Sequence, residues 1–246
     1  MIKCKAICYI ALLCSLLVGC NRQVPDVDMV FIPGGEFLMG SEDGDADPDE
    51  APIHSVYVND FYIGKYEVTQ KQWYAVMGRN LSQNRGDKLP VTNVSWDDCQ
   101  KFIKKLNEIT GKNYRLPTEA EWEYVASMYC KKAEGVDIKN YAWYLGSFEY
   151  TRKSNVYSQE VGSLPFDSMG IYDIIGNVNE WCFDSYDSLS YSKGFSQESD
   201  EKVFRGGCFA NQENFLRPTN RNHIDRHTKH FTLGLRLAMD ANPSND

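Results

Sequence analysis

The stretch that decides the fold runs from 170 to 181 and reads Gly170-Ile171-Tyr172-Asp173-Ile174-Ile175-Gly176-Asn177-Val178-Asn179-Glu180-Trp181. Its two carboxylates, Asp173 and Glu180, lie seven residues apart around a turn at Gly176. A hard cation such as calcium takes several oxygen ligands, which two carboxylates and the carbonyl groups between them can supply. A carboxylate can also cap such a turn by accepting backbone N–H groups. The stretch therefore predicts either a calcium site or a turn capped by acidic side chains.

Six further motifs surround this stretch in a fixed order. They read Phe31-Ile32-Pro33-Gly34-Gly35-Glu36-Phe37-Leu38-Met39-Gly40, Tyr66-Glu67-Val68-Thr69, Pro90-Val91-Thr92-Asn93-Val94-Ser95-Trp96, Tyr114-Arg115-Leu116-Pro117-Thr118-Glu119-Ala120-Glu121-Trp122-Glu123-Tyr124, Phe204-Arg205-Gly206-Gly207 and Leu233-Gly234-Leu235-Arg236-Leu237-Ala238. Together the motifs resemble the formylglycine-generating enzyme (sulfatase-modifying factor) family. The resemblance implies an α+β, C-type-lectin-like domain with little regular secondary structure at 28–240, followed by a tail at 241–246.

The resemblance also implies a calcium site within the quoted stretch. Its ligands would be the side chains of Asp173 and Glu180 and the backbone carbonyls of Gly176 and Val178. A second family site would use Asn155 and Val156 with a following acidic loop. That loop is short here, because 158–162 leads almost directly into Ser163-Leu164-Pro165. We therefore expect calcium at the first site and not at the second.

The fold does not decide the activity, because the family holds copper-dependent oxidases, iron-dependent sulfoxide synthases and non-catalytic modules. The oxidase binds copper(I) through two cysteines, since this soft ion prefers thiolates to oxygen. Counted from the Gly206-Gly207 pair, those positions are Asn211 and Leu216 here. Cys208, which replaces the family's serine, is the remaining catalytic candidate, although we favour a structural role for it. Copper is not expected, and a formylglycine-generating oxidase that acts on sulfatase cysteines is the alternative function.

The segment 211–231 is rich in asparagine, arginine and histidine between two apolar anchors. Long polar loops on a rigid scaffold often carry binding specificity. We predict that it contacts a peptide, carboxylate or glycan, although a solvated loop is the alternative. The predicted contact residues are Asn211, Arg217, Asn220, Arg221 and Arg226, with Trp181 and Phe209 as stacking partners.

Histidines offer a second possible metal site, because the family's iron-dependent branch needs three. His223 and His227 would share one face of a helix, which is a metal-binding spacing. Asp225 and Arg226 lie between them, however, and the matching family segment is an irregular loop. We therefore expect an exposed polar loop and not a metal site.

Local patterns predict strands near the beginning of the domain and three short amphipathic helices after them. The apolar runs around Pro33-Gly34-Gly35 predict a hairpin, and the alternation at 54–66 predicts a strand. The acidic stretch at 42–50 is typical of a solvated loop. Helices are expected at 69–78, 95–111 and from Thr118, with N-caps at Thr69, Ser95 and Thr118. The second would bury Trp96, Cys99, Phe102, Ile103, Leu106 and Ile109 on one face, and no later helix longer than about two turns is expected.

The first 19 residues predict an export signal, because Lys3 and Lys5 precede an apolar run at 7–18 that contains no acidic residue. That run is shorter than the roughly 20 residues that span a bilayer as a helix. The following Leu17-Val18-Gly19-Cys20 resembles the lipobox of bacterial lipoproteins. We expect a signal peptide at 1–19, a palmitate-type lipid on Cys20 and a tether at 20–27. Ordinary cleavage nearby, with Cys20 a bystander, is the alternative.

Composition limits the class of partner. The chain is 13% aromatic and 24% charged, which indicates a folded domain, and its net charge of -8 argues against nucleic acid or an anionic membrane face as the main partner. Cys99, Cys130, Cys182 and Cys208 form no CxxC pair, and they permit up to two disulfides or remain free thiols. We predict a lipid-anchored, non-catalytic, calcium-stabilised module of the bacterial envelope, with the outer membrane as its site. Its partner would be an envelope protein, a peptide or a glycan.

Overall fold

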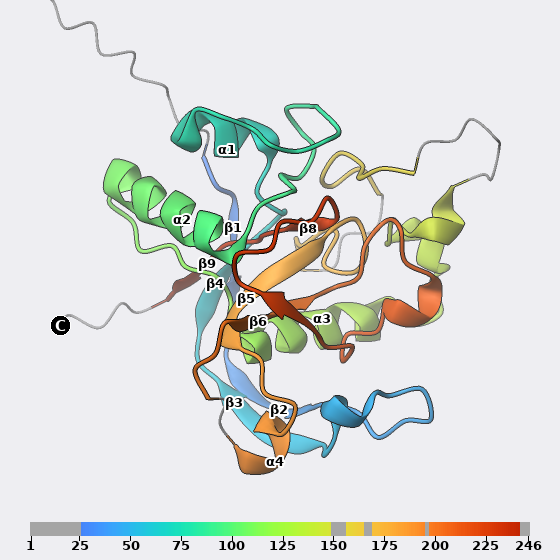
Figure 1. Cartoon of the computed structure of the whole chain (residues 1–246). Coiled ribbons are helices and arrows are strands. Elements are labelled where there is room, and N and C mark those ends of the chain that lie inside the picture. The colour runs from blue at the N-terminus through green and yellow to red at the C-terminus, as the bar shows by residue number, and fades with distance from the viewer. Residues whose placement is uncertain (1–25, 149–155, 165–168, 195–196, 242–246) are drawn as a thin grey trace, which may run out of the picture.

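The structure is a computed structural model that describes residues 26–148, 156–164, 169–194 and 197–241. Three small sheets and short helices make up an α+β fold, as expected (Figure 1). The first sheet has the order β1-β4-β9, the second pairs β2 with β3, and the third has the order β7-β6-β5-β8. The strands are β1 (Met29–Ile32), β2 (Gly35–Met39), β3 (His54–Val58), β4 (Phe61–Gly64), β5 (Asn179–Ser185), β6 (Glu201–Arg205), β7 (Asn222–Asp225), β8 (Leu233–Gly234) and β9 (Ala238–Asp240).

The predicted hairpin around Pro33-Gly34-Gly35 is wrong. β1 pairs with β4 and β2 pairs with β3, so the turn leads the chain from one sheet to another. Gly34 lies so close to β3 that a Cβ atom on it would be 2.3 Å from the carbonyl oxygen of Val58. The single strand predicted at 54–66 is also divided, since β3 and β4 are separate strands on either side of Asp60, which accepts a 2.7 Å hydrogen bond from the Gly34 N–H.

The three predicted helices are confirmed. They are α1 (Gln70–Met77), α2 (Trp96–Thr110) and α3 (Glu119–Lys132), and in each the predicted Thr or Ser caps the first turn by accepting a backbone N–H bond. The prediction for Ile109 is wrong, because its side chain is 55% exposed. The remaining helical turns are α4 (Ser190–Lys193) and the 3-10 turns η1 (Pro48–Glu50), η2 (Ile138–Asn140), η3 (Leu145–Ser147) and η4 (Glu213–Phe215).

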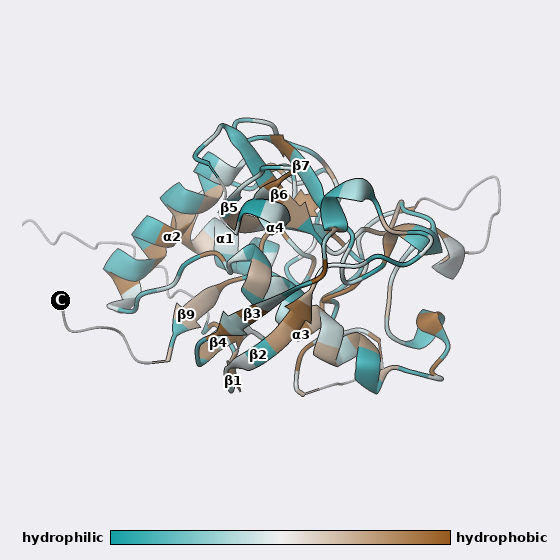
Figure 2. Ribbon diagram, turned by 90° about the horizontal axis from the view of Figure 1, so that it is seen from below, coloured by the Kyte–Doolittle hydropathy of each residue, from teal (hydrophilic) through white to brown (hydrophobic). Residues whose placement is uncertain are grey.

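Two apolar clusters form the core. One packs α3 through Trp122 against Phe61 and Ile171, and the other joins α1 to α2, where Trp73 stacks on Phe102 at 4.8 Å. Figure 2 shows the hydrophilic residues of α2 on the outer side of the molecule.

The four cysteines of the domain are free thiols, so neither disulfide that the sequence permitted is present. Among the residues described, no helix is both long enough and apolar enough to span a bilayer.

Candidate functional site

A cavity of about 340 Å³ lies where the third sheet meets the segment after Gly206-Gly207. None of the described residues that line it is Asp, Glu, Lys or Arg. Amides, an imidazole, a hydroxyl and a thiol supply its polar groups, and aromatic and aliphatic side chains supply the rest. The lining residues are Asn179, Phe204, Gly207, Cys208, Ala210, Asn211, Phe215, Asn220, Asn222, Ile224, His230, Phe231, Thr232 and Leu233.

The glycine pair directs the chain into this cavity. Gly206 and Gly207 have φ values of 102° and 69°, which L side chains rarely adopt. The turn brings Cys208 to Asn211, whose Oδ1 atom accepts bonds from the Cys208 N–H at 2.9 Å and from its thiol at 3.0 Å. Burial raises the pKa of the Cys208 thiol above its ordinary value. Because the thiolate is the reactive form, this environment does not activate Cys208 as a nucleophile.

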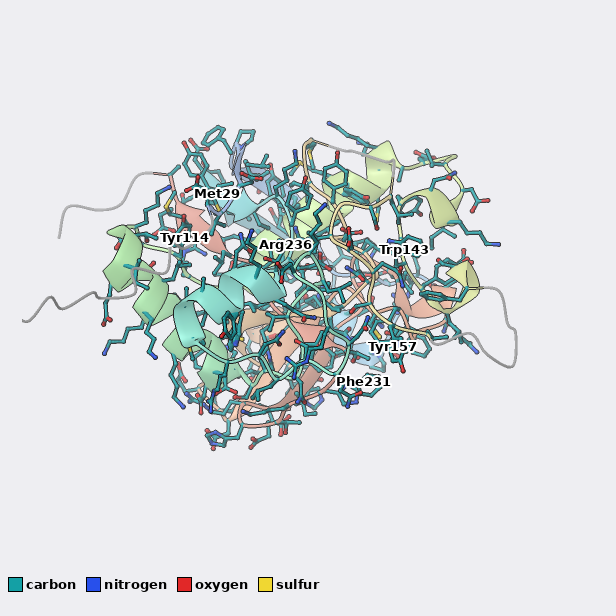
Figure 3. All side chains as sticks on the ribbon, turned by 90° about the horizontal axis from the view of Figure 1, so that it is seen from above. Met29, Tyr114, Trp143, Tyr157, Phe231 and Arg236 are labelled. Carbon is teal, nitrogen blue, oxygen red and sulfur yellow. The ribbon has the colours of Figure 1, made fainter. Side chains whose placement is uncertain are left out.

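Thr232 also lines the cavity. Its hydroxyl lies 2.7 Å from Nδ1 of His230 and 3.4 Å from Nδ2 of Asn179. Exposed rings lie at the opening, since Phe231 and Phe215 are 39% and 44% exposed although both line the cavity. Figure 3 shows Phe231 and Tyr157 on the same side of the molecule. The site therefore combines a few hydrogen-bonding groups with apolar walls, which is typical of ligand pockets.

Of the predicted ligand-binding residues, only Asn211 and Asn220 line this cavity. Arg217 instead forms a two-bond ion pair with Glu50, at 2.7 Å for each bond. Glu50 is completely buried, so the acidic stretch at 42–50 is not simply a solvated loop. Burial opposes ionisation of Glu50, but the hydrogen bonds from Arg217 prevail and lower its pKa.

The two other predicted arginines are also structural. Arg221 is buried, binds Glu119 through bonds of 2.7 and 2.9 Å, and lies over the ring of Tyr191. Arg226 binds Asp97 at 2.6 Å and lies over the ring of Trp96. These guanidinium groups tie the segment 217–226 to the rest of the fold, and none of the three lines the cavity.

The predicted stacking partners are buried as well. Trp181 is fully buried and donates a 3.0 Å hydrogen bond to the carbonyl of Val94, and Phe209 is 2% exposed. Neither ring can stack on a ligand in this structure. The sequence analysis missed Asn222, His230 and Phe231, although the alternation of Asn220 and Asn222 placed both amides on one side of an extended segment.

The histidines do not form a metal site. His223 lies in strand β7, stacks on Tyr186 at 3.7 Å and lies 2.9 Å from a carboxylate oxygen of Glu201. His227 contacts Asp97 instead. In the part of the chain that the structure describes, no three His, Cys, Asp or Glu side chains are placed to hold a metal ion.

The residues of the calcium prediction fit a cation only in part. Asp173 accepts a 2.6 Å bond from the Gly162 N–H through one oxygen, while its other oxygen is buried without a partner among the described residues. Burial raises the pKa of Asp173 to about 6. The Glu180 carboxylate is already bound by Arg236 at 2.7 Å and by the Trp122 indole at 2.9 Å. Asp173 therefore has a free ligand atom and Glu180 does not. Asn155 of the second calcium prediction lies outside the described residues.

The comparisons of this chain with known proteins agree on one family. The model of a family described as "Sulfatase-modifying factor enzyme 1-like domain" matches residues 17–241. "Chaperone protein LppX" from Paenibacillus barcinonensis is 31% identical, over 79% of this chain and 82% of that protein. "Serine/threonine-protein kinase Pkn1" from Chlamydia trachomatis is 29% identical over 87% of this chain, which spans 38% of that protein's length. "Formylglycine-generating enzyme" from Streptomyces coelicolor is 25% identical, over 86% of this chain and 89% of the enzyme.

A solved structure confirms the fold. "Treponema denticola variable protein 1" superposes with a TM-score of 0.72 and 27% identity, over 86% of this chain and 94% of that chain. The similar proteins thus include one named as a formylglycine-generating enzyme and others that carry different names. The pocket residues must therefore distinguish between these functions.

Proposed function

Because the chain belongs to the sulfatase-modifying factor enzyme 1-like family, we propose that it is a non-catalytic member that binds an uncharged polypeptide segment in the cavity at Gly206-Gly207. One observation carries the proposal. Where the family's oxidase needs two thiolates, this chain has Asn211 and Leu216. Asn211 lines the cavity and Leu216 packs in the core.

The geometry argues against the oxidase. The Asn211 amide is engaged by Cys208, and Leu216 is 5% exposed and packs in the core. Copper(I) is held by soft ligands, and a single neutral thiol beside an amide and a leucine is a poor substitute for a thiolate pair. The other three cysteines of the domain do not compensate, since Cys99, Cys130 and Cys182 do not line the cavity.

A polypeptide suits the chemistry of the cavity. Asparagine side chains offer the same donor and acceptor groups as a peptide backbone, and they can therefore pair with an extended segment. The aromatic rings at the opening can cover apolar side chains, while the absence of charged lining residues disfavours a charged ligand, which would lose its hydration without gaining a counter-charge. The name of the related chaperone protein also supports a polypeptide ligand.

The anchor and the calcium ion belong to the same proposal. A lipid on Cys20 would hold the domain at an envelope membrane, where an exported partner is available. A calcium ion would be held by Asp173 with the carbonyls of Gly176 and Val178, because Glu180 is bound by Arg236. Such an ion would stabilise the turn and take no part in a reaction.

Peptide binding tests the proposal directly. Labelled peptides of about ten residues, matched in composition except for charge, are titrated with the protein while fluorescence anisotropy is recorded; uncharged peptides should bind at least about tenfold more tightly. The double variant Asn222→Ala/Phe231→Ala should weaken binding by a further factor of about ten or more. The matched control Asn113→Ala/Phe183→Ala removes the same side-chain types from exposed positions outside the cavity and should change nothing. Equal effects of the two variants would overturn the assignment.

The alternative function has its own test. The protein, loaded with copper(I) under reducing conditions and then exposed to oxygen, is incubated with a Cys-x-Pro-x-Arg peptide, and the mass of the peptide is followed. We expect no conversion and no stoichiometric copper(I) binding, because the thiolate pair is absent. Conversion that is lost in Cys208→Ser would establish the oxidase and refute the proposal.

A further inference from the structure

A row of lysines covers the outer face of α2. Lys101, Lys104 and Lys105 are exposed, and Lys112 follows just after the helix. Glu108 is the one acidic residue between 99 and 112. The two aspartates at the start of the helix do not offset the lysines, because Asp97 pairs with Arg226 at 2.6 Å and Asp98 with Lys229 at 2.5 Å. In a chain of net charge -8, the exposed face of α2 is therefore positively charged, although the helix as a whole has three lysines and three acidic residues.

The same face carries an exposed apolar side chain. Ile109 is 55% exposed and follows Lys105 by four residues, so it continues the row of Lys101 and Lys105 along the helix. Lysine stems are themselves apolar and can lie along a hydrocarbon surface while the ammonium groups stay in water. Lysines around an apolar residue are typical of a face that rests on a lipid surface.

The described chain begins beside these helices. The carbonyl of Asp26 accepts a 3.0 Å hydrogen bond from Gln72 on α1, and Val27 and Met29 pack on the apolar cluster that α1 and α2 share. Figure 1 shows α1 next to α2. Cys20 precedes Asp26 by six residues, which span at most about 20 Å. A lipid on Cys20 would therefore hold the α1–α2 side of the domain close to the membrane.

We propose that the lysine face of α2, defined by Lys101, Lys104, Lys105 and Lys112, docks on anionic phospholipid headgroups and orients the anchored domain. This inference rests on the lipid anchor of the proposed function. A short tether would keep the α1–α2 side of the domain near the surface, where electrostatic attraction acts over a screening length of about 8 Å at physiological salt. The acidic remainder of the molecule is repelled by the same surface, so one orientation is selected.

Lysine labelling of the lipidated full-length protein tests the face. The protein is placed in phosphatidylcholine vesicles, or in vesicles with about 30% phosphatidylglycerol, and treated briefly with an amine-reactive reagent before mass spectrometry. Labelling of Lys101, Lys104 and Lys105 should fall about fivefold on the anionic vesicles and recover at about 0.5 M KCl. Lys131, Lys132 and Lys139 are exposed on another part of the domain and serve as internal controls, which should not change.

The outcomes separate this inference from the anchor. Equal labelling of the α2 lysines in both kinds of vesicle, or an equal loss at the control lysines, overturns the docking face. In the variant Lys101→Gln/Lys104→Gln/Lys105→Gln, protection of Lys112 should disappear, whereas Lys131→Gln/Lys132→Gln/Lys139→Gln should retain it. A protein that does not float even with neutral vesicles refutes the lipid anchor, and with it this inference. Peptide binding in the cavity would not be affected by that result.

Discussion

At the scale of single residues, the arginines of the segment 217–226 are held by acidic side chains of the fold. Arg217 reaches Glu50 across the fold, and Arg221 reaches Glu119. A buried carboxylate is costly unless it is paired, so each guanidinium is fixed by the acidic group that it neutralises. The neutral side chains between these arginines, such as Asn220 and Asn222, are the ones left to line the cavity.

The Glu50–Arg217 pair gives a pH-dependent prediction. Glu50→Gln should destabilise the protein by about 3 kcal/mol at pH 7, because Arg217 then loses the fully buried carboxylate to which it donates two hydrogen bonds. The pKa of Glu50 is lowered in the folded state, so the pair contributes fully above the ordinary carboxyl pKa, and its contribution is lost as pH falls through the lowered value. Urea unfolding should therefore show a difference between wild type and variant that shrinks at acidic pH. The control is Asp45→Asn, because Asp45 is an exposed carboxylate 3.5 Å from Arg217. This variant should lower the free energy of unfolding by less than about 1 kcal/mol. A loss equal to that of Glu50→Gln would contradict the argument.

At the scale of elements, the turn at Gly34 connects strands of two different sheets, whereas a hairpin turn connects two strands that pair with each other. A Cβ atom at this position would lie 2.3 Å from the Val58 carbonyl oxygen, which is backbone and cannot move aside cheaply. Gly34→Ala should therefore destabilise the protein by several kcal/mol, about 3 or more, or prevent folding. Gly44→Ala, where no atom lies within 4 Å of the added Cβ, should stay within about 0.5 kcal/mol of wild type. Tryptophan fluorescence during urea unfolding measures both, and a tolerated Gly34→Ala would show that β1 and β2 are not held as described.

The turn at 173–180 gives a prediction for calcium. The unpartnered oxygen of Asp173 is buried, and a bound cation would satisfy it. Calcium at 100 times its dissociation constant should stabilise the protein by about 2.7 kcal/mol, and a chelator should remove that gain. Asp173→Asn should abolish the response in calorimetry, while the exposed Asp137→Asn should keep it. An unchanged melting temperature at saturating calcium would mean that Asp173 only caps the turn.

At the scale of the whole molecule, the order of the sequence motifs predicted the fold, and helix caps such as Ser95 and Thr118 predicted the helix boundaries. These features depend on neighbours in the sequence. The cavity could not be predicted in the same way, because it needs the register of the third sheet, where Phe204 of β6 faces Asn222 of β7. The burial of Trp181 and the exposure of Ile109 could not be predicted either, since a local pattern does not show which element covers a side chain.

The cysteines offer the last prediction, because their state concerns the whole domain. Cys99 and Cys182 are fully buried, and burial raises the thiol pKa of each of the four above its ordinary value. The native protein should therefore react with a thiol reagent at pH 7.5 far more slowly than a free cysteine, by a factor of about 100 or more. In denaturant without reductant, Cys99, Cys130, Cys182 and Cys208 should all become alkylated, which peptide mass spectrometry measures. Any pair that stays protected until a reductant is added is a disulfide and contradicts the structure, whereas rapid native alkylation of Cys208 alone would restore it as a catalytic candidate.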